Sequence, residues 1–204
     1  MSDLAVEFAK KIVATKNKVK TKFDGNVALS VIDIDDKLAL KLGKEKGTYA
    51  TVEFPFDPVK QSMHRKVILD ATIKAMRGVM GKCLDSELKS VLVVGLGNPK
   101  MIADCFGSKT IEKTFATRHV LNLVHEFKDL CEVSCISTNV FGKTGLESFD
   151  IVNGVVKEIK PDIVVLLDTL VAESSKRLCT NIQIANVGIV PGSGVDNARK
   201  ELSK

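Results

Sequence analysis

Two aspartates, Asp104 and Asp168, follow apolar runs that are typical of buried strands. Asp168 directly ends the run Ile163-Val-Val-Leu-Leu, and Asp104 lies in the loop beyond the run Val91-Leu-Val-Val. Two carboxylates held close together cannot both ionise easily, so one can act as an acid while the other activates a water molecule. Alternatively, the pair could hold a divalent metal ion that polarises a carbonyl and acidifies bound water. A structural alternative is that each aspartate caps the helix that follows it.

Other residues could complete a site around this pair. Backbone amides at the bend after the first strand, and in the glycine-rich stretch after the last one, could stabilise an oxyanion, although a plain turn explains the second stretch equally well. A lone histidine could orient substrate or bind a metal, but it is more often structural. The predicted binding residues are Gly97, Asn98, His119, Gly192, Ser193 and Gly194. The metal alternative would use Asp104, Asp168 and His119 as ligands.

Two glycine motifs resemble nucleotide loops without matching them. Gly95-Leu-Gly97 lacks the third glycine of a dinucleotide fingerprint, because Lys100 occupies that position and Pro99 interrupts the expected helix start. Gly142-Lys-Thr-Gly145 lacks the earlier glycine of a phosphate-binding loop. We therefore predict no cofactor, with a divalent metal ion as the alternative.

The composition is that of a globular protein, with 45% hydrophobic and 27% charged residues in a chain of 204. No apolar run approaches the ~20 residues that span a bilayer, and the N-terminus lacks the features of a signal peptide, so we expect a cytoplasmic protein. The net charge of +5 is mild, and the absence of Trp with a single Tyr argues against a base-stacking surface. We predict neither membrane nor direct nucleic-acid binding.

Five cysteines, an odd number without a CxxC pair, predict reduced and mostly buried thiols rather than a disulfide framework or zinc site. Cys105 is adjacent to Asp104, and it would need a nearby base to act as a nucleophile.

The order of elements predicts an α/β fold. Strands are expected at 91–96, 132–138, 162–168 and 181–187, and helices at about 146–159 and 172–178. This alternation favours a parallel sheet with helices on both faces, in which ligands bind beyond the carboxyl ends of the strands. Before it, we expect strands at 26–34 and 49–54 and helices within 3–20 and 59–80. The prediction is one domain, 1–204, with a three-layer α/β/α arrangement and a mostly parallel central sheet, in which 1–85 extends the sheet and 86–204 carries the site.

Seven segments, in order along almost the whole chain, together resemble the germination protease family of spore-forming bacteria, also called spore protease. They are SDLAVE at 2–7, KGTYATVEF at 46–54, VLVVGLGNP at 91–99 with Asp104 and Gly107, ATRH at 116–119, GKTGLES at 142–148, IKPDIVVLLDTLVAESSKRL at 159–178 and NIQIANVGIVPGSGVDNARKELS at 181–203. Each match alone is weak, and jointly they are specific.

The resemblance implies an endopeptidase that cleaves the small acid-soluble proteins coating spore DNA at germination. The two aspartates proposed for the family fall on Asp104 and Asp168. The family's fold is similar to that of the hydrogenase maturation proteases and the phosphorylases, and the former place acidic residues around a metal. The resemblance also implies a homotetramer, a location in the spore core if the organism sporulates, and a zymogen whose mature form begins about where this chain begins.

This sequence departs from the family pattern at several positions. Ser108 stands where the family usually has a proline, and Asp168-Thr-Leu-Val replaces an aspartate-alanine-leucine-alanine run. Glu173 stands where an arginine is usual, and the chain stops before the family's further C-terminal segment. The alternatives are therefore a metal-dependent peptidase of the hydrogenase-maturation type, or a non-catalytic binding relative.

Overall fold

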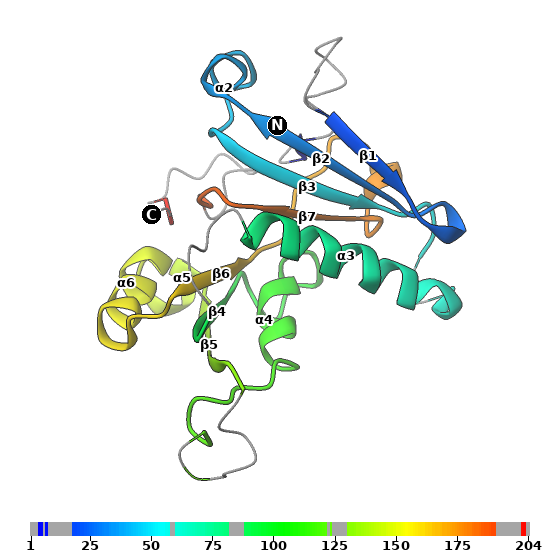
Figure 1. The fold of residues 1–204 in the computed structure, drawn as a ribbon. Helices are drawn as coiled ribbons and strands as arrows, with labels where there is room; N and C mark the ends of the chain where they lie inside the picture. The colour runs from blue at the N-terminus through cyan, green and yellow to red at the C-terminus, as the bar shows by residue number, and fades with distance from the viewer. Residues whose placement is uncertain are drawn as a thin grey trace. The chain divides into compact units, whose positions relative to one another are not determined.

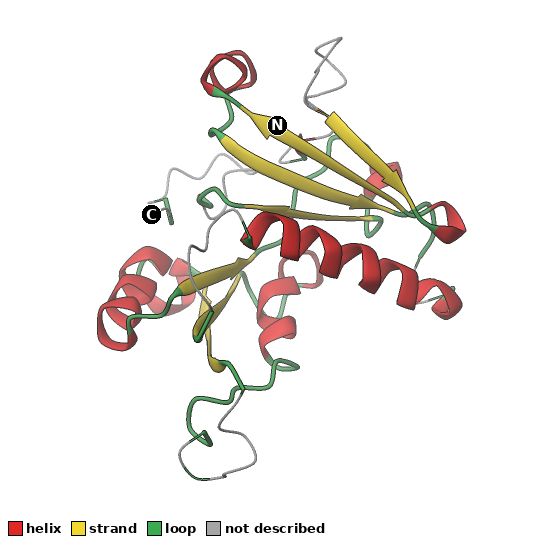
Figure 2. Ribbon diagram, viewed as in Figure 1, coloured by secondary structure: helices red, strands yellow, loops and turns green. Residues whose placement is uncertain are grey.

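The structure, a computed structural model, describes residues 4, 5, 7, 18–57, 60–81, 88–121, 123, 130–190 and 201–202. The chain divides into two units, the first formed by residues 1–85 and 170–187 and the second by 86–169 and 188–204. Each unit contains its own sheet, and the elements can be followed in Figure 1 and, by type, in Figure 2.

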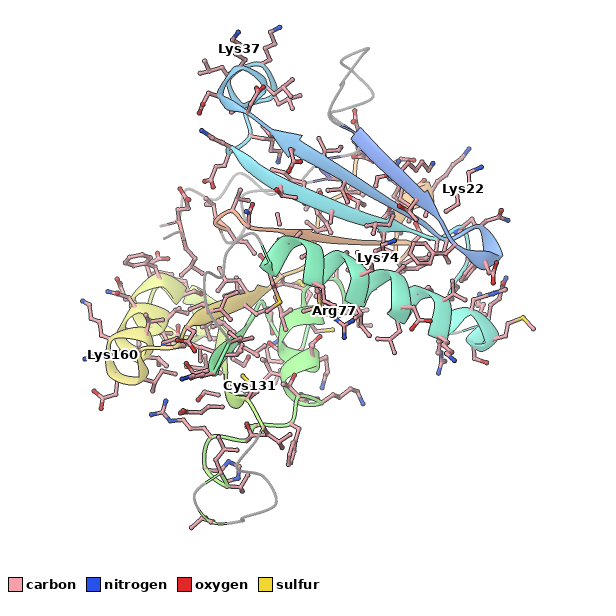
Figure 3. The ribbon with its side chains drawn as sticks, in the orientation of Figure 1. Lys22, Lys37, Lys74, Arg77, Cys131 and Lys160 are labelled. Carbon is pink, nitrogen blue, oxygen red and sulfur yellow. The ribbon has the colours of Figure 1, made fainter. Side chains whose placement is uncertain are left out.

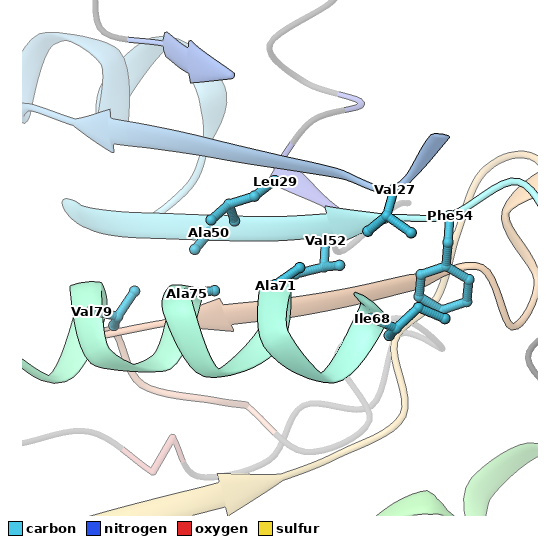
Figure 4. Packing of buried hydrophobic residues seen from close by; sticks show 9 residues of the cluster. All are labelled: Val27, Leu29, Ala50, Val52, Phe54, Ile68, Ala71, Ala75 and Val79. Carbon is cyan, nitrogen blue, oxygen red and sulfur yellow. The ribbon is translucent and has the colours of Figure 1, made fainter. Parts of the chain in front are cut away.

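The first unit is built on an antiparallel sheet with the strand order β1-β2-β3-β7. Its strands are β1 (Lys18–Lys22), β2 (Ala28–Ile34), β3 (Gly47–Glu53) and β7 (Asn181–Ala185), with the short turn η1 (Asp24–Asn26) between β1 and β2. One face packs against α3 (Arg65–Met80), which follows the turn η2 (Ser62–His64). The small side chains of Ala71 and Ala75 let this helix lie close to the sheet. The core residues of this face are Val27, Leu29, Ala50, Val52, Phe54, Ile68, Ala71, Ala75 and Val79 (Figure 4).

The other face of this sheet carries a second hydrophobic cluster. Leu4 and Ala5 are buried there with Ile32, Ile34 and Tyr49, and side chains of α2 (Asp36–Leu42) pack against them. The Asp35 carboxylate caps α2 by accepting the Leu38 N–H at 2.9 Å, and Gly43 ends the helix in the left-handed conformation. Leu4 and Ala5 are therefore part of the folded first unit.

Tyr49 offers a test of this cluster, because it is the chain's single tyrosine and there is no tryptophan. Burial, with a smaller contribution from the charge of Glu45, raises the pKa of Tyr49 to about 12. The phenol also donates to the Glu45 carbonyl at 2.9 Å. Because the folded pKa lies above the unfolded value of about 10, the stabilisation is complete below pH ~10 and is lost as the pH rises through the folded value.

We expect the phenolate absorbance of the native chain to titrate with a midpoint near 12. In denaturant the same band should titrate near pH ~10. A native midpoint equal to the denatured one would show that Tyr49 is not buried.

The second unit is built on a parallel sheet with the strand order β5-β4-β6. Its strands are β4 (Ser90–Leu96), β5 (Glu132–Asn139) and β6 (Ile163–Leu167). The helical segments are η3 (Ile102–Asp104), α4 (Phe106–Ile111), α5 (Phe141–Thr144) and α6 (Ser148–Ile159). Val152 of α6 packs in one cluster with Leu92, Val94 and Leu96, so the central strand β4 is buried under α6.

Asp162 joins the beginnings of β4 and β6. Its Oδ2 accepts the Ser90 N–H at 2.8 Å, the Lys89 N–H at 3.0 Å and the Ser90 hydroxyl at 3.0 Å. The hydrogen bond from the Ser90 amide, followed by that from Lys89, lowers the pKa of the Asp162 carboxyl. Because the folded pKa is depressed, its stabilisation is present above the unfolded value of about 3.9 and is lost as the pH falls through the folded value.

We expect Asp162→Asn to lower the thermal midpoint most above pH ~4, and the difference from wild type to shrink as the pH falls further. Thermal melts across an acid pH series would check this. A difference that does not change with pH in this range would mean that the charge of Asp162 contributes nothing to stability.

The mixed α/β class is confirmed, but the expectation of one mostly parallel sheet is wrong, because the described residues form two sheets. The strands predicted at 26–34 and 49–54 are present as β2 and β3, yet they pair antiparallel in a sheet of their own. The strand predicted at 181–187 is present as β7, but it pairs antiparallel with β3 instead of joining the parallel strands. The three-layer α/β/α arrangement is not confirmed.

Smaller differences concern the first unit. Lys18–Lys22 form a strand, although the sequence pattern predicts a helix as far as residue 20. The helix α2 was not predicted, and the expected short helix at 172–178 is a single turn, η5 (Ser175–Arg177).

The expectation of mostly buried thiols is wrong for the cysteines that the structure describes. Cys105, Cys131 and Cys135 are half-buried, Cys179 is exposed and all four are free, while Cys83 lies outside the described residues. Partial burial raises the pKa of Cys131, at the start of β5 (Figure 3), and that of Cys135. Both thiols therefore stay protonated at neutral pH. Within the described ranges no helix has the length and apolar character needed to cross a bilayer.

Candidate active site

The carboxyl ends of β4 and β6 meet at one edge of the parallel sheet. The two strands are direct neighbours, and Gly95 of β4 pairs with Leu167, the last residue of β6. Asp168 follows Leu167, so it leaves the sheet beside the bend that begins at Gly97. The Asp168 Oδ1 accepts the Thr169 N–H at 2.8 Å. No helix begins at this point, so Asp168 is not a helix cap.

Asp104 folds back onto the bend after β4. Its Oδ2 accepts the Asn98 N–H at 2.8 Å. Gly97 has a φ of +91°, and a Cβ at this position would overlap the Asp104 backbone oxygen and lie 2.8 Å from Oδ1. Only glycine fits such a bend without strain. The helix α4 has no side-chain cap, so Asp104 is not a helix cap either.

Glycines let the first turn of α4 lie directly on the strand ends. A Cβ on Gly107 would overlap the Leu167 carbonyl oxygen and lie 2.5 Å from the Leu96 carbonyl oxygen. A Cβ on Gly95 would lie 2.5 Å from the Gly107 carbonyl oxygen. Asp104 is three residues before Gly107 and Asp168 one residue after Leu167, so this contact brings both aspartates to the same edge of the sheet.

The amide of Asn98, which the sequence predicts as an oxyanion donor, donates to the Asp104 carboxylate in this structure. The Asn98 side-chain oxygen accepts the Lys100 N–H at 3.0 Å, which shapes the same loop. Asn98 thus holds Asp104 in place. Gly192, Ser193 and Gly194 lie outside the described residues, so their predicted role stays a prediction.

His119 lies at the opposite edge of this sheet. The N–H groups of its neighbours Thr117 and Arg118 donate to the Val133 carbonyl at 3.0 and 3.1 Å, at the start of β5. The Arg118 guanidinium also pairs with Glu132 at 3.1 Å. Because each strand residue advances the chain by about 3.3 Å, the starts of the strands are far from their carboxyl ends. The structure does not bring His119 to the aspartates.

The two aspartates alone offer few ligands for a metal ion. Among the described residues, no group of three or more His, Cys, Asp or Glu side chains is placed to hold one. The metal alternative therefore has two carboxylates at this edge and no third described ligand. Two carboxylates suit acid–base activation of a water molecule without further protein groups.

Two serines to which the sequence analysis assigns no function, Ser108 and Ser137, lie beside this site. Ser108 in the first turn of α4 is 3% exposed, and its Oγ lies 2.9 Å from that of Ser137 and 3.3 Å from the Gly97 carbonyl oxygen. The sequence does not show whether a serine in the first turn of a helix is buried or exposed to solvent. It therefore gives no sign of the contact between these two hydroxyls.

The first unit has a cavity of its own, of about 640 Å³, and most of the residues that line it are charged or carry amides. Arg177 lies in its wall, with its guanidinium 3.2 Å from the Glu7 carboxylate and 2.9 Å from that of Glu53. The Glu7 carboxylate also accepts the Glu173 N–H at 3.0 Å. These ion pairs thus join Glu7, β3 and the segment after β6. None of the predicted site residues that the structure describes lines this cavity.

Comparison with known proteins identifies the family of this chain. A family model described as "Germination protease" matches residues 6–204. The germination protease of Geobacillus sp. is 37% identical over 90% of this chain and 50% of its own length. That of Clostridium acetobutylicum is 36% identical over 100% of this chain and 65% of its own. That of Bacillus subtilis is 34% identical over 100% of this chain and 58% of its own. The chain thus spans about half to two thirds of the length of these relatives.

Proposed function

Because this chain belongs to the germination protease family, we propose that it is an endopeptidase that hydrolyses peptide bonds with a water molecule activated between Asp104 and Asp168. The observation that carries this proposal is that the carboxyl ends of β4 and β6 lie side by side at one edge of the parallel sheet. Gly107 packs directly against both strand ends. Ligands bind beyond this edge in parallel α/β sheets.

The proposed reaction uses both aspartates in different protonation states. One carboxylate removes a proton from water as the oxygen attacks the peptide carbonyl, and the protonated partner donates a hydrogen bond to the carbonyl oxygen. The proton taken from water then passes to the leaving amine as the C–N bond breaks. The Asn98 amide is occupied by its hydrogen bond to Asp104. In this scheme the hydrogen bond to the substrate carbonyl therefore comes from the protonated aspartic acid.

The apolar residues beside Asp104 support a polypeptide substrate. Met101, Ile102 and Phe106 are 53%, 96% and 50% exposed around it. Exposed apolar side chains that border a site can bind the side chains of an extended chain. Following the family resemblance, we propose small acid-soluble spore proteins as substrates, a homotetramer as the assembly, and the cytoplasm, or the spore core of a sporulating cell, as the location.

The direct test is incubation of the purified chain with a small acid-soluble spore protein, with products identified by mass spectrometry. We expect discrete internal cleavage that continues in the presence of a chelator. Loss of cleavage with the chelator and its return with a divalent ion would replace the two-aspartate scheme by the metal-dependent one. Stoichiometric binding of the spore protein without cleavage would favour a non-catalytic relative.

A further inference from the structure

The peptide group between Gly97 and Asn98 is hydrogen-bonded on both sides. Its N–H, which belongs to Asn98, donates to the Asp104 Oδ2 at 2.8 Å. Its carbonyl oxygen, which belongs to Gly97, accepts the Ser108 hydroxyl at 3.3 Å. A peptide group is planar and rigid, so fixing its oxygen also fixes the direction of its N–H.

Ser108 is in turn held by the neighbouring strand. Its Oγ lies 2.9 Å from the Oγ of Ser137, which is close to the carboxyl end of β5. When Ser108 donates its one hydroxyl proton to the Gly97 oxygen, Ser137 is the donor to Ser108. The hydrogen bonds therefore form one chain, from Ser137 through Ser108 and the Gly97–Asn98 peptide to Asp104.

This series of hydrogen bonds restricts the backbone of the bend at Gly97. Gly97 has no side chain to restrict its backbone, so the plane of the peptide that follows it can rotate more easily than elsewhere. Hydrogen bonds in series also polarise one another, which strengthens the N–H that meets the carboxylate.

We propose that Ser108 is a positioning residue for Asp104, which it orients through the Gly97–Asn98 peptide. The proposal rests on the proposed function in one respect only, because the orientation of Asp104 matters for rate if Asp104 takes part in the reaction. Ser137 is its outer support and is exposed, so its replacement tests the same chain of hydrogen bonds without disturbing a buried side chain.

The test compares Ser108→Ala and Ser137→Ala with Ser148→Ala as the matched control. Ser148 is also buried, and its Oγ lies 3.2 Å from the Thr138 Oγ1, outside this chain of hydrogen bonds. In Ser108→Ala we expect the Asn98 amide proton to shift upfield in NMR spectra and to exchange about fivefold faster, as for the loss of one hydrogen bond. Ser137→Ala should cause a smaller change in the same direction, and Ser148→Ala none.

The kinetic expectation separates positioning from general loss of structure. In Ser108→Ala, kcat should fall by about tenfold to a hundredfold while KM stays nearly unchanged, because a misplaced catalytic group affects the chemical step. Ser108→Thr, which keeps a hydroxyl, should restore most of the rate. Ser148→Ala should leave both constants unchanged.

An Asn98 amide with the wild-type shift and exchange rate in Ser108→Ala would overturn the proposal. An altered amide with an unchanged kcat would overturn it as well, because the hydrogen bond would then not position a catalytic group. If the wild-type chain hydrolyses no substrate, the proposed function fails. The NMR comparison alone then decides whether Ser108 holds the Asp104 carboxylate.

Discussion

Replacing Asp104 or Asp168 by Asn should reduce peptide hydrolysis by about 10²–10⁴-fold, which is the range for loss of a general acid or base. Asn has nearly the same shape as Asp and keeps an oxygen that can accept the Asn98 N–H, so the bend after β4 should survive. The amide cannot take a proton from water or give one to a carbonyl oxygen. The loss should therefore appear in kcat, with folding intact by circular dichroism and thermal melting.

Asp70→Asn is the matched control for these variants. Asp70 is exposed on α3 in the first unit, so this variant removes the same charge away from the site. It should leave the rate unchanged. Full activity in either Asp104→Asn or Asp168→Asn would contradict the two-aspartate scheme.

The double variant tests whether the two aspartates act as one unit. When two catalytic residues act in the same step, removing either one abolishes their joint effect on the rate. Removing the second then slows the reaction little further. We therefore expect Asp104→Asn/Asp168→Asn to be about as slow as the slower single variant. Rate losses that multiply would instead assign the two residues to independent steps.

The three strands and α6 of the second unit could be predicted from local patterns. The run Ile163–Leu167 is apolar at every position, which is typical of a parallel strand buried on both faces.

The segment Asn181–Ala185 alternates between polar and apolar residues, which is typical of an antiparallel strand with two different faces. Its Ile182 and Ile184 pack with α3 in the first unit. The sequence thus contains a sign that the two strands belong to different sheets. The prediction of a single parallel sheet gave more weight to the alternating order of strands and helices.

The site was predictable only where it depends on strand order. Strand ends that meet at one edge follow from parallel pairing, so Asp104 and Asp168 could be assigned together from the amino-acid sequence. The roles of Asn98 and Ser108 depend on single hydrogen bonds at the bend formed by Gly97. They could not be predicted, because residue spacing does not determine how a peptide group is oriented. His119 was assigned from its type alone, and its position at the other edge follows from backbone contacts with Val133 that no motif indicates.

Gly107→Ala is expected to destabilise the second unit by about 1–3 kcal/mol or more, as overpacking does where the backbone cannot move away. The added Cβ would overlap the Leu167 carbonyl oxygen and lie 2.6 Å from the Leu96 nitrogen, both of them backbone atoms of paired strands. Helix propensity opposes this loss by only about 1 kcal/mol. Because the displaced strand ends lead to Asp104 and Asp168, hydrolysis should fall as well.

Gly154→Ala makes the same substitution where there is room. Gly154 lies in α6, and a Cβ there would meet nothing within 4 Å, so only the gain in helix propensity of up to about 1 kcal/mol remains. Denaturant unfolding of both variants should therefore give changes of opposite sign, with activity lost only in Gly107→Ala. If the two variants are equally stable, α4 does not rest on the strand ends, and the contact that places both aspartates at the same edge of the sheet is absent.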